Sequence, residues 1–233
     1  MRVVVPLAGP DFIRPDGSVK AEIVVHGQPM LRAALGSRPW AAEVAPEKHV
    51  FVMADRPETR AFASGPLARW YPGAAQVFLG QYSQGAALSA LAGVAMSVAE
   101  DGPLIVDLAD ILYASDLKPG FVFSRDPECG AIALAFQSKS PSYSYLRLDH
   151  DGRVVEAAEK RVISTNASAG TYVFADASVY LAAVAHALRD FDGQQHNGLL
   201  YVCPLFNGVL AAGYNVDLAP VTDVVDIKQG DFQ

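Results

Sequence analysis

Residues 2–9 read RVVVPLAG, an apolar run with three consecutive valines that ends in a glycine-containing loop. Short apolar runs bounded by turn residues are typical of buried strands in parallel sheets. Comparable runs recur at residues 49–53, 75–79 and 103–107, and Ala-rich stretches of helical length lie between them. This alternation predicts an α/β fold in which helices cover a largely parallel sheet.

The pattern changes in the second half of the chain. Residues 131–137 and 144–148 have the composition of strands, and we expect these two strands to pair with each other. A turn at 149–152 joins the second of them to a strand at 154–158, and a further strand is expected at 170–175. The second half is therefore expected to be more antiparallel than the first.

Length and composition favour one folded domain. The chain has 233 residues, against roughly 150 for a typical domain, and we treat 1–233 as a single domain with halves at 1–128 and 129–233. Hydrophobic residues make up 51% and charged residues 18%, which excludes disorder as a global description. The 18 Lys and Arg residues against 25 Asp and Glu residues give a net charge of -7, which argues against nucleic acid as a partner.

The cysteines and the apolar segments indicate a reduced, cytoplasmic protein. Cys129 and Cys203 lack the spacing of a metal site or of a disulfide framework. The segment after Met1 has no basic region followed by an apolar core, so we expect no signal peptide. The longest apolar-leaning stretch, 85–99, is shorter than the ~20 residues that cross a bilayer, so we expect no membrane span.

The loop after the first strand is a candidate anion site. It contains Gly9, Arg14 and Lys20, which places flexible backbone and two cations at the carboxyl end of a strand. Ligands of open α/β sheets bind at that edge, where cations and backbone amides can neutralise phosphate oxygens. The alternative is a plain surface loop, because loops are polar and exposed as a rule.

Two carboxylates lie at and just beyond the end of the fourth apolar run. Asp107 and Asp110 are hard oxygen ligands suited to Mg²⁺, which binds substrate phosphates through the rest of its coordination shell. The alternative is that one of them caps the segment that follows, as Asp residues at strand ends often do.

A third group of polar residues lies between positions 159 and 171. Glu159 and Lys160 follow a predicted strand, and a short loop separates them from Asn166, Gly170 and Thr171. A carboxylate, a cation, an amide and a small glycine in one neighbourhood can recognise hydroxyl and phosphate groups. The alternative for Glu159 and Lys160 is a solvated surface pair.

Taken in order along the chain, these segments resemble the sugar-nucleotidyltransferase family, the nucleoside-diphosphate-sugar pyrophosphorylases, and especially its short members found with polysaccharide-biosynthesis genes. Residues 19–30, VKAEIVVHGQPM, are similar to the family stretch P-K-P-L-I-x-V-x-G-K-P-M. Residues 80–87, GQYSQGAA, are similar to G-Q-T-x-G-A-A, and residues 200–207, LYVCPLFN, to Y-x-x-P-L-Y-N. The acid-rich segment 107–110, the pair 159–160 with the strand at 163–174, and the tail 225–227 occupy the places of further family motifs.

The resemblance implies a Rossmann-like fold of the glycosyltransferase-A type, with a mixed sheet flanked by helices. It also implies an Mg²⁺-dependent enzyme that joins a nucleoside triphosphate to a sugar 1-phosphate, giving a nucleotide sugar and pyrophosphate. The catalytic residues implied are Arg14, Lys20 and Asp110. The nucleotide-binding residues implied are Leu7, Ala8, Gly9, Gln81, Gln84 and Gly85. The sugar-phosphate-binding residues implied are Glu159, Lys160, Asn166, Gly170 and Thr171, and the metal ligands are Asp107, Asp110 and Asp226.

The loop after the first strand departs from the family pattern. The family has G-x-G-x-R, whereas residues 9–14 read GPDFIR, so the second glycine is missing and the arginine is shifted. Pro10 has no N–H to donate, and Asp11 is expected to repel a triphosphate. Two alternatives therefore stay open: a member that binds nucleotide or sugar phosphate without transfer, and a glycosyltransferase that uses a finished nucleotide sugar. The base, the sugar (or a phosphorylated alcohol in its place) and a homo-oligomeric state are left open.

Overall fold

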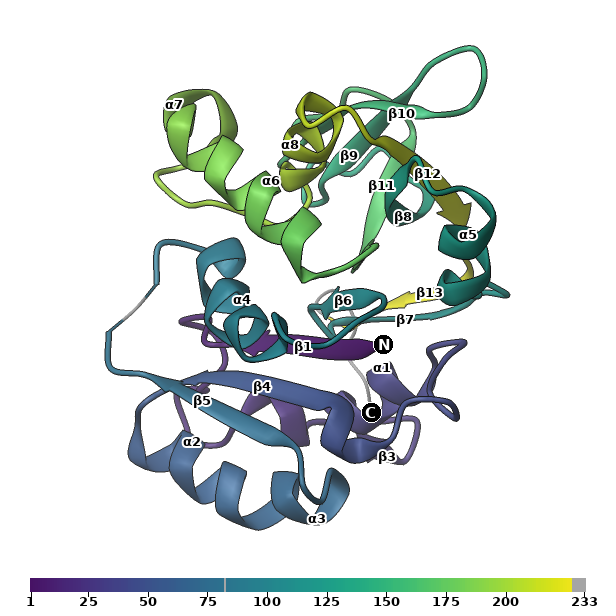
Figure 1. Ribbon diagram of the computed structural model, residues 1–233. Helices are drawn as coiled ribbons and strands as arrows, with labels where there is room; N and C mark the ends of the chain where they lie inside the picture. Colours follow the sequence, from purple (N-terminus) through teal and green to yellow (C-terminus); the bar gives the residue numbers. More distant parts are fainter. Residues whose placement is uncertain (82, 228–233) are drawn as a thin grey trace.

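The computed structural model describes residues 1–81 and 83–227 and has the expected α/β fold. A nine-stranded mixed sheet lies at its centre, with helices on both faces (Figure 1). Its strands are β1 (Arg2–Leu7), β4 (His49–Ala54), β5 (Ala75–Leu79), β6 (Leu104–Asp107), β8 (Cys129–Gln137), β9 (Tyr145–Leu148), β10 (Val154–Ala158), β11 (Asn166–Phe174) and β12 (Asn215–Pro220). Two small sheets pair β2 (Val24–Val25) with β3 (Gln28–Pro29), and β7 (Ile111–Ala114) with β13 (Thr222–Asp226).

The helices fill the connections between the strands. The α-helices are α1 (Met30–Gly36), α2 (Pro57–Phe62), α3 (Ala68–Trp70), α4 (Ala86–Val94), α5 (Pro119–Arg125), α6 (Ala177–Arg189), α7 (Phe191–Gln194) and α8 (Leu205–Ala211). Single 3₁₀ turns lie at Lys20–Glu22, Pro46–Lys48 and Ala95–Ser97, and a π-helical turn lies at Ala63–Leu67. The helical segment between β4 and β5 is thus divided into three parts, and Pro66, which has no N–H to donate, lies in the π-helical part. No helix in the described part of the chain has the length and apolar character needed to cross a membrane.

The first half of the chain forms the parallel part of the sheet. β1 lies between β4 and β6 and is parallel to both, and β5 follows β4. Successive side chains of a strand point to opposite faces, so Val4 packs with α4 on one face and Val3 and Val5 pack with α1 on the other. The three valines that open the chain are therefore all buried, which explains why the apolar run does not alternate with polar residues.

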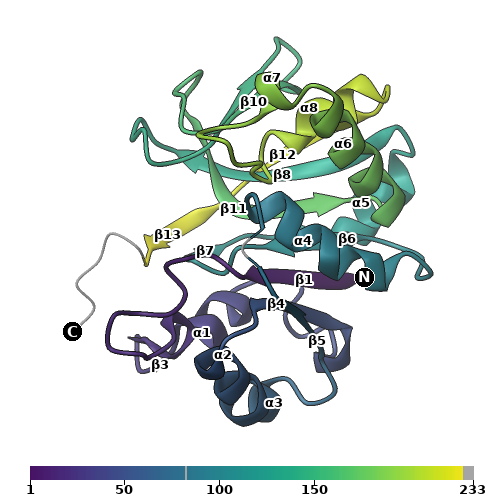
Figure 2. The ribbon, with the colours of Figure 1, turned by 90° about the vertical axis from the view of Figure 1, so that its left-hand side faces the viewer.

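The second half adds the antiparallel part, on the far side of β6 from β1, as Figures 1 and 2 show. β11 is antiparallel to β6, with Thr171 opposite Asp107, and β8 pairs with the other edge of β11. The hairpin β9–β10 forms around the expected turn at 149–152. The expected pairing of strands 131–137 and 144–148 with each other is wrong. β8 and β9 lie on opposite edges of β11 because β11 is buried along nearly its whole length and takes a central position.

The contact between α4 and the sheet requires a glycine. A Cβ on Gly93 would lie 2.6 Å from Cγ1 of Val4 and 2.9 Å from Cγ2 of Val52. Both valines belong to buried strands, so neither can move aside without disturbing the core. α4 therefore lies close against β1 and β4, directly after the loop that carries Gly85.

Gly93→Ala should destabilise the protein although alanine is the better helix former. We expect a loss of about 1–3 kcal/mol, because overpacking of a dense core outweighs the gain of roughly 1 kcal/mol in helix propensity. Urea denaturation followed by circular dichroism measures the change. Gly120→Ala in α5 is the matched control, since no atom lies within 4 Å of its added Cβ, and it should leave the midpoint unchanged or raise it. A Gly93→Ala variant as stable as the parent would contradict the packing described here.

Candidate functional site

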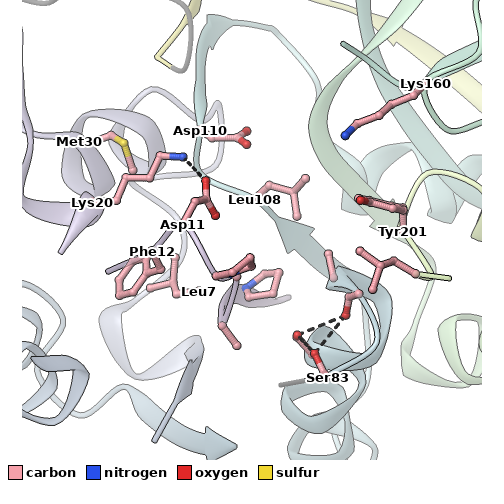
Figure 3. Close-up of a pocket in the computed structure, with 18 residues that line it drawn as sticks. Leu7, Asp11, Phe12, Lys20, Met30, Ser83, Leu108, Asp110, Lys160 and Tyr201 are labelled. Carbon is pink, nitrogen blue, oxygen red and sulfur yellow. Dashed lines mark hydrogen bonds and ion pairs between the residues drawn. The ribbon is translucent and has the colours of Figure 1, made fainter. Parts of the chain in front are cut away.

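Two adjoining cavities open at the carboxyl ends of β1 and β6. The first has a volume of about 360 Å³ and is shown in Figure 3, and the second has a volume of about 400 Å³. Volumes in this range suit small-molecule ligands. The two cavities share five lining residues, which are Ala86, Leu108, Asp110, Lys160 and Tyr201. They therefore form two compartments of one site.

The second cavity lies where the edge of β11 changes partner. β11 pairs with β6 over residues 171–174 and with β9 over residues 166–167. Between these ladders the backbone N–H of Leu108 donates to the carbonyl of Gly170 (2.9 Å), and the N–H of Ser168 donates to the carbonyl of Ser144 (2.9 Å). β6 and β9 separate at this point of the sheet, and side chains from the loop after β6 and the loop before β9 line the gap between them.

The loop after β1 supplies one wall of the first cavity. Leu7, Ala8 and Gly9, for which the sequence predicts nucleotide binding, line it together with Lys20. Phe12 is buried against Phe62, with ring centres 5.9 Å apart, and anchors the middle of the loop. Lys20 is fixed in turn, because its backbone N–H donates to the carbonyl of Phe12 (2.8 Å).

Lys20 is paired within the cavity. Its Nζ lies 2.9 Å from Oδ2 of Asp11, and Figure 3 shows this ion pair beside Asp110. The Lys20 side chain is 18% exposed, whereas that of Asp11 is 69% exposed. The cation is thus held against the fold, and the carboxylate is the more exposed partner.

Arg14 does not line either cavity. Its guanidinium lies 3.6 Å from Oδ2 of Asp16 and donates to the hydroxyl of Ser18, on the exposed tip of the loop. The loop turns back on itself at this point, since the N–H of Arg14 bonds to the carbonyl of Ser18. The structure therefore separates Arg14 from Lys20, with which the sequence groups it.

Of the three residues in the 80–87 motif that are predicted to bind nucleotide, Gly85 lines the first cavity. It has a φ of +110°, and a Cβ there would overlap the backbone of Leu200, so only glycine fits. Gln84 takes part through its backbone, whose carbonyl accepts from the N–H of Leu200 (2.9 Å). Gln81 and Gln84 do not line the cavity, whereas Ser83 does. Tyr82 lies outside the described residues.

The two carboxylates that follow β6 have different surroundings. Asp107 is fully buried and accepts two hydrogen bonds from Arg38, Nε to Oδ2 (2.6 Å) and Nη2 to Oδ1 (2.9 Å). The N–H of Ala109 (2.8 Å) and the hydroxyl of Thr171 (3.2 Å) also donate to it. Asp107 lines neither cavity, and its oxygens are engaged in the interior. We therefore omit it from the metal ligands proposed below.

Arg38 is as buried as its partner. Burial by itself lowers the pKa of Arg38, but Asp107, together with Tyr113 and Asp110, outweighs this effect and raises the pKa above its ordinary value. The guanidinium also donates to the carbonyl of Ile111 (2.9 Å) and lies 4.1 Å from the centre of the Tyr113 ring. The pair therefore connects the end of α1 to β6, β7 and β11. No motif in the sequence singles out Arg38, because its partner is 69 positions away.

Asp110 faces the site because the chain reverses at Ala109. Ala109 has a φ of +54°, and its N–H is held by Asp107. Asp110 is 7% exposed and lines both cavities. A Cβ on Gly170 would lie 3.1 Å from Oδ1 of Asp110, so the glycine leaves space beside this carboxylate. The structure thus brings together Asp110 and Gly170 of the predicted set.

Asp226 reaches the same place from the far end of the chain. β13 pairs with β7 so that Asp226 lies opposite Ile111, next to Asp110, and both carboxylates line the second cavity. The hydroxyl of Tyr143 donates to Oδ2 of Asp226 (2.6 Å). Burial raises the pKa of Tyr143, and the hydrogen bond to Asp226 raises it further, so the phenol stays protonated and donates.

Glu159 and Lys160 follow β10 and contribute to the walls of the site. Glu159 lines the second cavity and accepts a hydrogen bond from the hydroxyl of Ser144. Lys160 has a φ of +49° and lines both cavities, and its Nζ lies 5.6 Å from the centre of the Tyr201 ring. Figure 3 shows Lys160 and Tyr201 across the first cavity from Lys20.

Two predicted residues of β11 lie outside the site. The side chain of Asn166 bonds to that of Gln137 (2.8 Å), and Thr171 is buried against Asp107. Sequence reasoning also missed several lining residues, which share hydroxyl groups and are Ser83, Ser142, Tyr143, Ser144, Ser168 and Tyr201. Ser142, Tyr143 and Ser144 lie in the polar segment 138–144, SKSPSYS, which precedes β9 and is the signal that could have indicated these three.

Asp110 and Asp226 are the residues that could hold a metal ion. Their carboxylate oxygens suit Mg²⁺, and Gly170 leaves space beside Asp110. Among residues 1–81 and 83–227, no set of three or more His, Cys, Asp or Glu side chains gathers into a metal cluster. An Mg²⁺ ion here would therefore take its remaining ligands from water and substrate oxygens.

The fold matches those of several solved structures. No protein-family model and no curated protein matches the sequence. The nucleoside-diphosphate-sugar pyrophosphorylase from Vibrio cholerae RC9 matches with a TM-score of 0.80 and 20% identity, over 97% of this chain and 95% of that one. The inositol-1-phosphate CTP transferase from T. maritima matches with a TM-score of 0.70 and 15% identity, over 96% and 86%. A UDP-glucose pyrophosphorylase complexed with UDP-glucose matches with a TM-score of 0.66 and 13% identity, over 97% and 92%. These likenesses confirm the expected fold.

Arg38→Met should destabilise the protein strongly. It leaves the Asp107 carboxylate buried without its counter-ion, which costs about 3–5 kcal/mol. Thermal and urea denaturation measure the loss. The matched control is Arg60→Met, which removes the same two-bonded geometry from the exposed partner Asp55 and should move the midpoint little because water screens that pair. Equal effects of the two substitutions would mean that the Arg38–Asp107 pair does not hold the strand end.

Proposed function

We propose that the chain is a nucleotidyltransferase that joins a nucleoside triphosphate and a sugar 1-phosphate, releasing pyrophosphate. The observation that carries this proposal is the place of Asp110 on both cavities, with Lys20 lining the first and Lys160 lining both. Two compartments that share a carboxylate and a cation suit two phosphorylated substrates whose reacting groups meet at the boundary. The fold shared with the pyrophosphorylases and the CTP transferase supports the same reaction.

The reaction needs positioning and charge neutralisation more than a protein nucleophile. An oxygen of the sugar phosphate attacks the α-phosphorus in line, a new P–O bond forms, and the bond to the β-phosphate breaks as pyrophosphate leaves. Lys160 holds the phosphate of the acceptor at the boundary. Lys20 offsets charge on the leaving pyrophosphate in the first cavity. No covalent enzyme intermediate is required.

Asp110 and Asp226 are proposed to hold Mg²⁺. When bound, the ion would neutralise phosphate charge in the transition state. Tyr143, which donates to Asp226, would keep the orientation of this carboxylate by using one of its oxygens. Asp110 is kept in place from behind by the turn at Ala109 and the buried Asp107.

The second cavity has the lining of a hydroxyl-binding site. Ser142, Ser144 and Ser168 contribute hydroxyl groups, and Glu159 contributes a carboxylate that already accepts from Ser144. Hydroxyls can donate and accept, and carboxylates accept, so this set complements the many hydroxyl groups of a sugar. The lining therefore favours a sugar phosphate as the acceptor.

A second candidate function is binding of nucleotide or sugar phosphate without transfer. The observation that favours it is the tip of the β1 loop, where Pro10 has no N–H to offer and Asp11 already occupies Lys20. Such a protein would bind either ligand and release no pyrophosphate.

Pyrophosphate release tests the two candidates. The purified chain is incubated with Mg²⁺, each common nucleoside triphosphate and a panel of sugar 1-phosphates, and thermal shifts are recorded with the same ligands. Release with one pair supports the transferase and identifies its substrates, and EDTA should abolish it. Thermal stabilisation by ligand without release with any pair supports the binding protein. No stabilisation and no release would contradict both functions.

Asp110→Asn should lower the rate of pyrophosphate release at least about 100-fold, because it removes a charge from the boundary of the two compartments. The fold should persist, since the carboxylate faces the cavities and not the core, and circular dichroism checks this. Asp116→Asn is the control, as Asp116 is an exposed acid between β7 and α5 that lines neither cavity. Unchanged turnover of Asp110→Asn would remove this residue from the proposed site.

Lys20→Ala should raise the KM for the nucleoside triphosphate about tenfold and leave the KM for the sugar phosphate nearly unchanged. The reason is that Lys20 lines the first cavity and not the second. Steady-state kinetics with each substrate varied in turn measures the two constants, with the exposed Lys118→Ala as control. Equal changes in both KM values would show that the compartments are not divided as proposed.

A further inference from the structure

The tip of the β1 loop carries a carboxylate, that of Asp11, beside the cation Lys20. One oxygen of Asp11 lies 2.9 Å from Nζ of Lys20, and the other lies 3.0 Å from the position that a Cβ on Gly9 would occupy. The carboxylate is thus folded back over the backbone of Gly9 and against the cation. A cation beside a glycine backbone at a strand end is where an anionic ligand would be expected to bind.

The backbone of the loop offers little to an anion besides this place. Pro10 has no N–H, and the N–H of Phe12 donates within the loop to the carbonyl of Gly9 (3.1 Å). Arg14 is turned away toward Asp16. Of the two cations of the loop, Lys20 is therefore the one that an anion in the first cavity can reach.

The charges around the first cavity balance. Among the described residues that line it, Lys20 and Lys160 are matched by Asp11 and Asp110. A cavity of this composition does not attract an anion by net charge, although Lys20 and Lys160 are the groups that would contact one. Neutralising Asp11 would leave one positive charge in excess.

We propose that Asp11 is an intramolecular competitor that occupies the phosphate-binding position at Lys20 and sets the affinity of the site for nucleoside triphosphates. A ligand phosphate must displace the carboxylate to reach Lys20. The exposure of Asp11 permits this, because its side chain can swing into solvent while Lys20 stays anchored. This inference rests on the proposed function, since it assumes that the first cavity takes the triphosphate.

The test is the affinity of the Asp11→Asn variant for polyphosphate. Isothermal titration with inorganic tripolyphosphate, and then with each nucleoside triphosphate, is done with and without Mg²⁺ at low ionic strength, where charge effects are largest. Asn has the size of Asp and lacks its charge. We expect Asp11→Asn to bind tripolyphosphate about tenfold more tightly than the parent chain. The double variant Asp11→Asn with Lys20→Ala should lose this gain.

Asp16→Asn is the matched control. Asp16 is an acid of the same loop, it pairs with Arg14, and it does not line the cavity. The substitution changes the net charge by the same amount as Asp11→Asn but leaves the Asp11–Lys20 pair in place. It should therefore leave the affinity for tripolyphosphate within about twofold of that of the parent chain. A gain in Asp16→Asn equal to that in Asp11→Asn would overturn the proposal, because net charge alone would then explain the effect.

The direction in which Asp11→Asn changes the affinity for tripolyphosphate distinguishes a competing Asp11 from an Asp11 that assists binding. If Asp11 instead positioned Lys20 for the ligand, Asp11→Asn would weaken binding, and the proposal would be wrong. Absence of tripolyphosphate binding in every variant would also overturn it. Pyrophosphate release by the parent chain is measured separately, so tighter binding by Asp11→Asn without any release supports the competitor and contradicts the transferase. Release by the parent chain with unchanged affinity in Asp11→Asn contradicts the competitor alone.

Discussion

The buried ion pair between Arg38 and Asp107 is the constraint on which the site depends. An isolated charge in a protein interior is very costly, so each partner is held where the other can reach it. Arg38 follows α1, and Asp107 ends β6, and the pair also bonds to Thr171 of β11 and to the carbonyl of Ile111 in β7. The first helix, the central strand and the start of the antiparallel half are thereby fixed to one another at the edge of the sheet where the cavities open.

The position of Asp107 determines, through the backbone that follows it, how the carboxylates of the site are oriented. Asp107 holds the N–H of Ala109, which adopts a left-handed conformation that non-glycine residues seldom adopt, and the turn directs Asp110 into the cavities. β7 begins at the next residue and pairs with β13, which brings Asp226 beside Asp110 from more than a hundred positions away. The buried Asp107 thus helps to orient the two carboxylates, Asp110 and Asp226, that line the second cavity.

The sequence predicted the local elements better than the long-range relations. β1 and β5 have the expected bounds, and the hairpin at 149–152 forms, because apolar runs and turn residues act over a few positions. The different surroundings of Asp107 and Asp110 could not be predicted, since both follow the same strand and only Arg38, which no motif marks, separates them. The pairing of β8 and β9 with β11 was missed for a similar reason: their order depends on a strand that comes later in the chain. Arg14 and Lys20 look equivalent in sequence, and the anchor at Phe12 decides which of them faces the cavity.

The chain is 13% to 20% identical to the solved structures named above and keeps their fold, while its β1 loop departs from the family pattern that the sequence resembles. The division of this loop into buried and exposed residues explains how both can hold. Phe12 and Val19 are buried and hold the loop to the core, whereas residues 9–11 and 14–17 at its tips are exposed. Substitution at an exposed tip changes the charge of the cavity and costs the core little packing, because most surface substitutions have small effects on stability. The sheet, the buried pair and the two facing carboxylates therefore do not depend on the identity of residues 10 and 11. Fold and chemistry can consequently diverge at this loop, because the charge that it places beside Lys20 lies outside the core.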